Sequence, residues 1–354
     1  MRASDEFRTQ TVELMCAAEV YQKQISWLWK DWLAKGKLHI LAGQAGTGKT
    51  TLAISLAATI SSGDRFADGS LCKKGSVLIW SGEDGIEDTL APRLSAAGAD
   101  LTKVHFIHGY FDYIEKRSFD PATDMVALMQ QVETMYDLAL LIIDPIVSAI
   151  KGDSNKNAEV RRDLQPLVDL ANNVNCAVLG ITHLSKGGQG KEPLERVTGS
   201  LAFGAVARIV MFAAKVKDGE NTKRIICRVK SNIGQDDGGF EYSLEQKEVR
   251  ADLFASYALW GYPLEGSAHS ILTESAYGSH DEHAKSALDS AKDFLLDILA
   301  NGELASMQIQ EDAKNAGHSM ATVRRAKSVL NIISSKSKLN NDWYWKLPSY
   351  LTTS

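Results

Sequence analysis

Short apolar runs alternate with amphipathic segments over most of the chain. Between residues 37 and 262 the apolar runs are rich in β-branched residues, and stretches with apolar residues at helical spacing separate them. The runs occupy residues 38–42, 77–80, 104–108, 140–143, 177–181, 208–212 and 224–228. Strands that alternate with helices are typical of βαβ units, so the pattern predicts an α/β fold with a mainly parallel central sheet.

The character of these runs changes along the chain. The runs at 140–143 and 177–181 are apolar throughout, which predicts central strands covered on both faces. In the later runs Arg and Lys alternate with apolar residues, and this pattern predicts edge strands.

Both ends of the chain have patterns of their own. Residues 1–36 end in apolar positions at mixed three and four spacing, which predicts a helical segment packed on the core. Residues 263–283 are rich in Gly, Ser, His and acidic residues, and we expect them to form a linker. Residues 284–354 show helix, turn, helix and an alternating strand, the outline of a small C-terminal winged helix-turn-helix domain.

Composition limits the class of protein. The chain has 354 residues, of which 44% are hydrophobic, so it can form one large core and a small second domain. Its net charge of −5 argues against a uniformly basic surface but allows a local basic patch. The four cysteines lack metal-ligand spacing and are predicted to be core residues in a reducing compartment. Neither a signal peptide nor an apolar run of bilayer length is found, so we expect a cytoplasmic protein without a membrane partner.

One glycine-rich segment carries the clearest chemistry. It follows the run at 38–42, precedes a predicted helix at 51–60 and matches a complete Walker A loop. The residues predicted to bind ATP are Gly43, Gln44, Ala45, Gly46, Thr47, Gly48, Lys49, Thr50 and Thr51. Backbone N–H groups of such a loop and of the following helix N-terminus bind phosphate. We expect Lys49 to contact the β- and γ-phosphates and Thr50 to place its hydroxyl on Mg²⁺.

Acidic residues follow two of the predicted strands. Asp144 ends the run at 140–143, where a Walker B carboxylate would hold the Mg²⁺ shell, although a simple strand cap has the same pattern. Glu83 and Asp84 follow the run at 77–80, and one of them could polarise the attacking water as a general base. We favour Glu83 for this role. The alternative is a charged loop held by Arg93.

A histidine follows the next buried strand. His183 lies just after the run at 177–181, where it could contact the γ-phosphate and relay its loss to the glycine-rich loop at 187–191. Thr182 could share this role. The alternative is a surface histidine in a loop.

Together these motifs resemble those of one ATPase family. The Walker A loop, the Glu83-Asp84 pair, the Walker B strand, the Thr-His-Leu-Ser-Lys segment and the Thr-Gly-Ser segment before Arg208 resemble the RepA-like branch of RecA/DnaB-type P-loop ATPases (AAA_25-type). The resemblance covers residues 27–245 and implies a RecA-like core. Plasmid-type members are hexameric replicative helicases, so the resemblance also implies a homo-oligomeric ring, a hexamer, with ATP sites between subunits.

The same resemblance implies an arginine supplied by the neighbouring subunit. Arg208 is the matching position, although an arginine before a strand can equally form a salt bridge at the edge of a sheet. DnaB-like relatives carry a Lys-x-Arg pair on a late strand. Here Lys230 is present but Asn232 stands where the arginine would be, which shifts weight toward Arg208.

Two basic regions are candidates for contact with DNA. Lys186, Lys191 and Arg196 surround the glycine-rich loop and could bind the backbone of single-stranded DNA, or they could be solvated loop charges. Residues 314–354 carry seven basic residues against one acidic residue, which indicates a phosphate-facing surface, with a domain for protein contacts as the alternative. The seven are Lys314, Arg324, Arg325, Lys327, Lys336, Lys338 and Lys346.

Three functions are consistent with these motifs. The first is a replicative helicase, an ATP-driven motor on single-stranded DNA that works with other replication proteins. The second is a non-helicase oligomeric ATPase that acts as a DNA-loading factor. The third is a nucleotide-switched DNA-binding regulator that works through the C-terminal domain.

Overall fold

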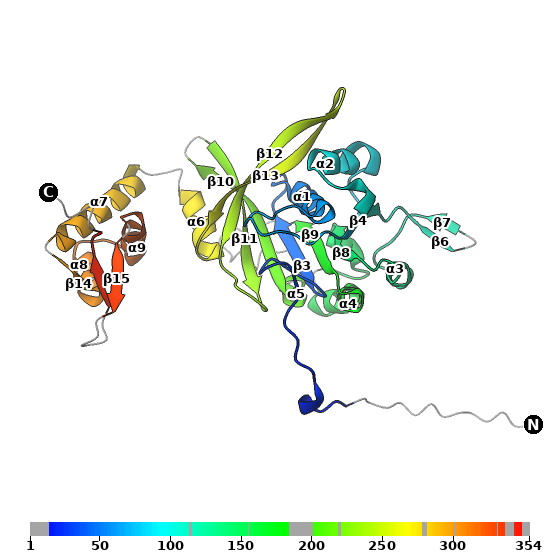
Figure 1. Cartoon of the computed structure of the whole chain (residues 1–354), viewed down its shortest axis with the longest axis horizontal. Coiled ribbons are helices and arrows are strands. Elements are labelled where there is room, and N and C mark those ends of the chain that lie inside the picture. The colour runs from blue at the N-terminus through cyan, green and yellow to red at the C-terminus, as the bar shows by residue number, and fades with distance from the viewer. Residues whose placement is uncertain are drawn as a thin grey trace, which may run out of the picture.

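Figure 1 shows the computed structural model of the chain. The residues that it describes are 14–112, 115–154, 156–183, 201–218, 221–277, 282–300, 302–330, 332–336 and 343–348.

A nine-stranded sheet forms the centre of the described chain. From one edge to the other its strands are β13 (Leu253–Leu264), β12 (Gly239–Arg250), β11 (Asn221–Ser231), β10 (Ile209–Asp218), β3 (Leu38–Gly43), β9 (Ala177–His183), β8 (Leu138–Asp144), β4 (Ser76–Ser81) and β5 (Val104–Phe106). The strands from β10 to β5 run parallel, whereas β11, β12 and β13 pair antiparallel. The α/β class and the mainly parallel sheet are therefore confirmed.

The antiparallel strands correct one prediction. The basic and apolar alternation of β10 and β11 predicts edge strands, but β10 lies between β11 and β3, and β11 lies between β10 and β12. The β12–β13 hairpin, which the sequence pattern did not predict, forms the edge instead. Only the first residues of β12 are buried, so this strand shows little apolar periodicity.

Helices cover both faces of the sheet (Figure 1). One face packs against α1 (Lys49–Ser62), the π-helix η2 (Ile86–Leu90) and α2 (Ala91–Ala96). The other face packs against α3 (Met125–Val132), α4 (Asn157–Val174), α5 (Leu201–Val206) and α6 (Ala268–Tyr277). The residues of β8 are all buried, and so are those of β9 except its last, because these strands have helices on both faces. Short connecting elements are η3 (Leu101–Lys103), β6 (Tyr110–Asp112), β7 (Glu115–Arg117) and η4 (Ile146–Ala149).

The structure describes residues 14–36 of the N-terminal segment, of which 14–26 are exposed and the hairpin that follows packs on the core. After a 3-10 turn, η1 (Ala17–Glu19), the segment forms a hairpin of β1 (Trp27–Trp29) and β2 (Leu33–Ala34). The turn places Asp31 at a φ of 61°. Trp29 is stacked between Trp32 and Phe66, with ring centroids 4.8 and 5.0 Å away. Over the described residues 14–36 the prediction of a helical segment was wrong, because burial of these aromatic rings against the sheet decides the local backbone. Residues 1–13 lie outside the described residues.

The predicted linker also contains regular structure. β13 extends to Leu264, and α6 (Ala268–Tyr277) follows it. Ile271 of α6 is 4% exposed and belongs to the main core. Residues 278–281 lie outside the described part of the chain. Much of the segment from 263 to 283 therefore belongs to the sheet domain.

The C-terminal elements have a hydrophobic cluster of their own. They are α7 (Glu282–Leu299), β14 (Leu304–Ala305), α8 (Ser306–Asn315), α9 (Met320–Val329), β15 (Ile333–Lys336) and β16 (Trp343–Lys346). The three strands form an antiparallel sheet in the order β14-β16-β15. Leu295, Ile309, Val323 and Trp345 meet in its core, which shares no residue with the core of the large sheet.

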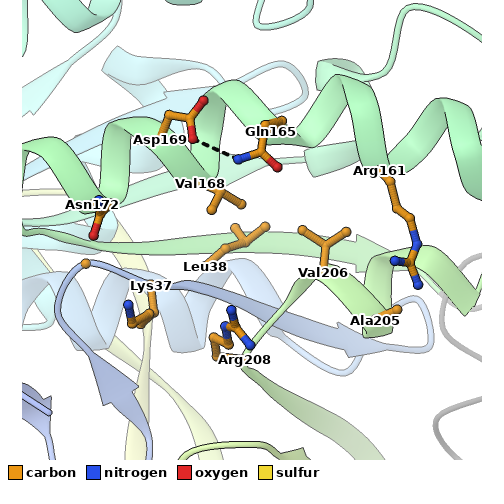
Figure 2. A pocket seen from close by; sticks show the side chains of 11 residues that line it. Lys37, Leu38, Arg161, Gln165, Val168, Asp169, Asn172, Ala205, Val206 and Arg208 are labelled. Carbon is orange, nitrogen blue, oxygen red and sulfur yellow. Dashed lines mark hydrogen bonds between the residues drawn. The ribbon is translucent and has the colours of Figure 1, made fainter. Parts of the chain in front are cut away.

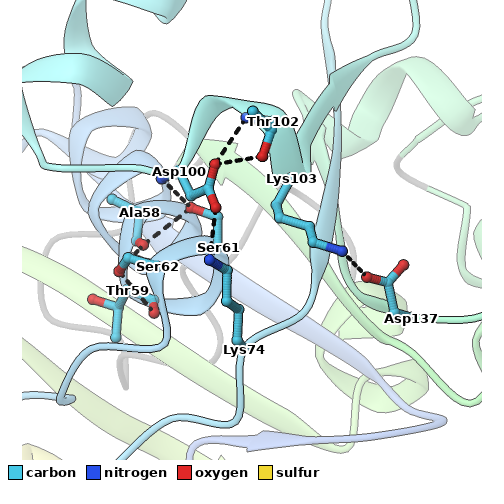
Figure 3. Close-up of polar contacts among 9 residues, drawn as sticks. All are labelled: Ala58, Thr59, Ser61, Ser62, Lys74, Asp100, Thr102, Lys103 and Asp137. Carbon is cyan, nitrogen blue, oxygen red and sulfur yellow. Dashed lines mark hydrogen bonds and ion pairs between the residues drawn. The ribbon is translucent and has the colours of Figure 1, made fainter.

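Polar contacts fix the C-terminal end of α1 (Figure 3). The Ser61 hydroxyl accepts a hydrogen bond from the Asp100 backbone N–H at 3.2 Å and donates to the Ala58 carbonyl. The Asp100 carboxylate accepts from Thr102 and pairs with Lys74 at 2.7 Å. These contacts hold the helix that begins at the glycine-rich loop against the segment that leads into β5.

Three of the four cysteines are buried as predicted, whereas Cys16 is exposed. In the part of the chain that the structure describes, no helix is both long and apolar enough to cross a membrane.

Candidate active site

The glycine-rich loop connects β3 to α1 and depends on backbone conformations that favour glycine. Gly46 and Gly48 adopt φ angles of 73° and 92°, in the left-handed region. A Cβ at Gly43 would collide with the carbonyl oxygen of Ala213 on the neighbouring strand β10. α1 then starts at Lys49 and runs for 14 residues. A glycine loop followed by the free N–H groups of a helix start is the backbone arrangement that binds phosphate in Walker A motifs, so this geometry agrees with the predicted role.

Lys49 lies across the base of this loop. Its Nζ donates to the carbonyl oxygens of Gly43 and Gln44, both at 3.0 Å, and lies 3.2 Å from Nδ1 of His183. Because an ammonium group can only donate, Nδ1 is the acceptor. Burial lowers the pKa of Lys49, while the negative charges of Asp144 and Glu83 oppose this effect. The ammonium group is thus held in the loop by carbonyl groups that a phosphate can replace.

Thr50 and Asp144 join the start of α1 to the end of β8. The Thr50 hydroxyl donates to Oδ2 of Asp144 at 2.6 Å. Asp144 is 5% exposed, and burial is the main reason why its pKa rises to about 6. A buried carboxylate beside a hydroxyl is a set of hard oxygen donors that suits Mg²⁺, and a cation there would relieve the cost of burying the charge. Both residues therefore fit the predicted metal site.

The two acidic residues after β4, Glu83 and Asp84, have different surroundings. Ser81 pairs with Asp144 in the β4–β8 register, which brings the residues that follow it to the same edge of the sheet. Asp84 forms an ion pair with Arg93 at 3.0 Å. Glu83 is exposed, and its charge acts on Lys49, Asp144 and His183. Of the two carboxylates, Glu83 is the one that faces the site without being held by an arginine.

His183 and Thr182 end β9, the strand beside the loop strand. Gly43 pairs with His183 in the β3–β9 register, so the histidine lies next to the start of the loop. Burial, and then the neighbouring charge of Lys49, lowers the pKa of His183, which favours the neutral form of its ring. Thr182 is buried, at 1% exposed. The glycine-rich loop that His183 is predicted to control, and Lys186, Lys191 and Arg196 around it, lie outside the described residues.

Strand β12 supports the loop from the opposite side. The Tyr242 hydroxyl donates to the carbonyl oxygen of Thr47 at 2.7 Å. A Cβ at Gly48 would lie 2.8 Å from Cδ1 of Leu244. Sequence reasoning missed both β12 residues. No motif marks them, because their contact with the loop depends on how β12 pairs in the sheet.

Arg208 lies at the other end of the sheet from the loop. Its backbone N–H donates to the Leu38 carbonyl at the start of β3, whereas the loop follows Gly43 at the end of that strand. Its side chain lines a pocket of about 340 Å³. Figure 2 shows this side chain near the start of β3, on the side where α4 lies. The pocket is lined by Gly36, Lys37, Leu38, Arg161, Gln165, Val168, Asp169, Asn172, Ala205, Val206 and Arg208. The structure therefore does not bring Arg208 into the phosphate site of its own chain.

Lys230 is used within its own chain. Its Nζ donates to the carbonyl oxygens of Gly204 and Ala207 at the end of α5, the latter at 3.0 Å. Burial lowers its pKa, and the nearby charges of Arg208 and Arg161 lower it further. Three cationic side chains thus lie close together at this end of the sheet.

Comparison with known proteins gives one family. The model of the AAA_25 family, described as an AAA domain, matches residues 3–189, more than half of the chain. Among solved structures, the chain is similar to a KaiC-like protein from the hyperthermophilic archaeon Pyrococcus horikoshii OT3, with 17% sequence identity and a TM-score of 0.44. The match covers 66% of this chain and 99% of that one. No curated protein shows a significant match.

Proposed function

Because the chain belongs to the AAA_25 family, we propose that it is a Mg²⁺-dependent ATPase built on a RecA-like core. The observation that carries the proposal is the contact between Thr50, at the start of α1, and Asp144, at the end of β8, beside the loop lysine Lys49. A P-loop lysine, a threonine hydroxyl and a strand-end carboxylate are the groups that bind a nucleoside triphosphate with its metal ion.

Each side chain has a role that its position supports. Lys49 exchanges its carbonyl partners for phosphate oxygens. Thr50 and Asp144 would hold Mg²⁺, and the bound ion would supply positive charge that neutralises the phosphates. Glu83 accepts a hydrogen bond from the attacking water and takes up its proton. The neutral ring of His183, beside Lys49, contacts the γ-phosphate and responds to its loss.

The direct test is ATP hydrolysis by the purified full-length chain with and without Mg²⁺. We expect hydrolysis that requires the metal and is lost in Lys49→Ala. Lys74→Ala, which removes an exposed lysine near the far end of α1, is the matched control and should retain the wild-type rate. Failure of the wild-type chain to bind or hydrolyse ATP would overturn the proposal.

We further propose a homo-oligomeric ring, a hexamer by its resemblance to RepA-like ATPases, in which Arg208 completes the site of the next subunit. Its side chain is exposed at the end of the sheet opposite the chain's own loop, where a neighbour's site can dock. Mixing Arg208→Ala with Lys49→Ala protomers should restore part of the activity, because some interfaces then contain both intact residues. Intact rings without any restored activity would exclude this role.

The finer proposal is a cytoplasmic DNA motor of the RepA-like helicase kind. The proposal of a winged helix-turn-helix is supported by the order of α8, α9 and the paired strands β15 and β16, and Arg324 on α9 is exposed. A helicase should hydrolyse ATP faster when single-stranded DNA is added and should form ring-sized particles. If single-stranded DNA leaves the rate unchanged and a short duplex binds through residues 284–354, a nucleotide-switched regulator or DNA-loading factor is the better description.

A further inference from the structure

A second lysine reaches the phosphate-binding loop from strand β10. Lys215 lies two residues beyond Ala213, which pairs with Gly43 at the end of β3. Its Nζ is 3.4 Å from the position that a Cβ on Gly46 would occupy. Its side chain is also exposed, so the ammonium group can approach a ligand in the loop.

Cross-strand pairing places an arginine next to this lysine. Lys215 pairs with Arg224 on β11, and Arg224 pairs with Tyr242 on β12. Residues that pair directly across strands point to the same face of a sheet. Tyr242 reaches the loop through the Thr47 carbonyl, so Lys215 and Arg224 also lie on the loop face. The three side chains form a row beside the loop.

This row carries uncompensated positive charge. Like charges at directly opposed positions repel each other. Among the described residues, no carboxylate forms an ion pair with Lys215 or Arg224. Nε of Arg224 is buried without a hydrogen-bond partner there. An anion bound at this edge of the loop would neutralise both cations and accept a hydrogen bond from the unused Nε of Arg224.

Lys215 and His183 lie on opposite sides of the strand that leads into the loop. β3 has β9 on one side and β10 on the other. His183 at the end of β9 contacts Lys49, while Nζ of Lys215 on β10 lies beside the loop at Gly46. We propose that Lys215 binds the polyphosphate of the nucleotide from the β10 side, with Arg224 beside it as a positioning residue. This inference rests on the proposed ATPase function, because it concerns the same site.

Binding of ADP, measured by titration calorimetry on the full-length chain, tests this role without relying on turnover. Lys215→Ala should weaken ADP binding by about tenfold, the value of one charge-assisted hydrogen bond. Lys215→Arg should restore most of the affinity, because the charge is retained. The matched control is Lys223→Ala, one residue from Arg224 on the opposite face, where Lys223 pairs with Glu241 at 3.2 Å. It should change the affinity by less than about twofold.

The nucleotide-free protein separates a binding role from a structural one. Removing one of two like charges should leave the Tm of free Lys215→Ala at or above that of the wild type, while the rise in Tm on adding ADP becomes smaller. If Lys215→Ala binds ADP with unchanged affinity, or lowers only the Tm of the free protein, the role of Lys215 is wrong while the ATPase proposal stands. A wild-type chain that binds neither ADP nor ATP would instead overturn the ATPase proposal.

Discussion

The hydroxyl of Tyr242 donates a 2.7 Å hydrogen bond to the carbonyl oxygen of Thr47, 195 residues earlier in the chain. Both residues are buried, at 4% and 1% exposed. The phosphate-binding loop is thus attached to a strand of the antiparallel part of the sheet, and its shape depends on that strand as well as on its own glycines.

Removing this hydroxyl should loosen the loop. In Tyr242→Phe the Thr47 carbonyl loses its buried partner, and we expect the free energy of unfolding to fall by about 1 kcal/mol in denaturant titrations. Nucleotide binding should weaken as well. Tyr257→Phe on β13 is the control, since the Tyr257 hydroxyl has no hydrogen bond among the described residues. Equal stabilities of Tyr242→Phe and wild type would show that this bond does not support the fold.

Gly48 has both a positive φ and a close neighbour. In Gly48→Ala we expect a loss of about 2 kcal/mol in the free energy of unfolding, mostly from backbone strain and in smaller part from displacement of the end of the Leu244 side chain. Gly98 has a φ of 80° with nothing within 4 Å of the position that a Cβ would occupy, so Gly98→Ala should lose only about 1 kcal/mol from strain. Adding Leu244→Ala should recover the difference if the contact is its cause. If the losses in unfolding free energy of Gly48→Ala and Leu244→Ala simply add in the double variant, the contact is not the cause.

Glu83 and Asp84 should differ in their effect on turnover. Glu83→Gln should lower the rate of ATP hydrolysis by about 100-fold or more and retain nucleotide binding, because the water loses its general base. Asp84→Asn breaks only a half-exposed pair with Arg93, worth up to about 1 kcal/mol, and should keep most of the activity. Comparable losses in single-turnover measurements on both variants would argue against Glu83 as the base.

His39 couples the fold to pH. Its ring is fully buried, its Nε2 accepts from the Ala34 N–H, and burial lowers its pKa to about 4. A lowered histidine pKa means that the folded state resists protonation, so this contribution is complete above pH 6.5 and is lost as the pH falls toward 4. Between pH 7 and pH 5 the free energy of unfolding should fall by about 2 kcal/mol on this account.

The matched variant for this pH effect is His39→Gln, which keeps an acceptor but does not titrate. Its free energy of unfolding should change less between pH 7 and pH 5 than that of the wild type. Asp124, with a pKa of about 2 beside Arg117, titrates below this window. Asp144, with a pKa of about 6, titrates within it, but both proteins contain Asp144, so its effect cancels in the comparison. Identical pH slopes for the two proteins would show that His39 is not responsible.

The parts of the site that could be predicted are those that local pattern determines. Gly43 to Thr50 form a contiguous motif, and Asp144 and His183 end or follow apolar runs, so the parallel sheet brings them to one edge. Tyr242 and Lys215 could not be found in this way. Their places beside the loop arise from pairing with strands far from it in sequence, parallel between β3 and β10 for Lys215 and antiparallel from β10 through β11 to β12 for Tyr242. The exposed second half of β12 also hides its periodicity.

The same dependence on distant contacts explains why the predicted N-terminal helix was wrong. Trp29 and Trp32 fit a helical spacing, but the stacking of these rings with each other and with Phe66 decides the conformation. Stacking of this kind depends on residues brought together by the fold, which spacing within one segment cannot reveal.

The position of β10 determines how short a fragment of this protein can be. β3 makes its second row of hydrogen bonds with β10, which starts at residue 209, beyond the segment that defines the family, residues 3–189. A fragment cut at residue 189 would leave the apolar β3 with an open side, and unpaired strands of this kind associate with other chains. The smallest unit that can be expressed without such aggregation therefore extends through the antiparallel strands and through α6, which covers one face of the sheet, to Tyr277.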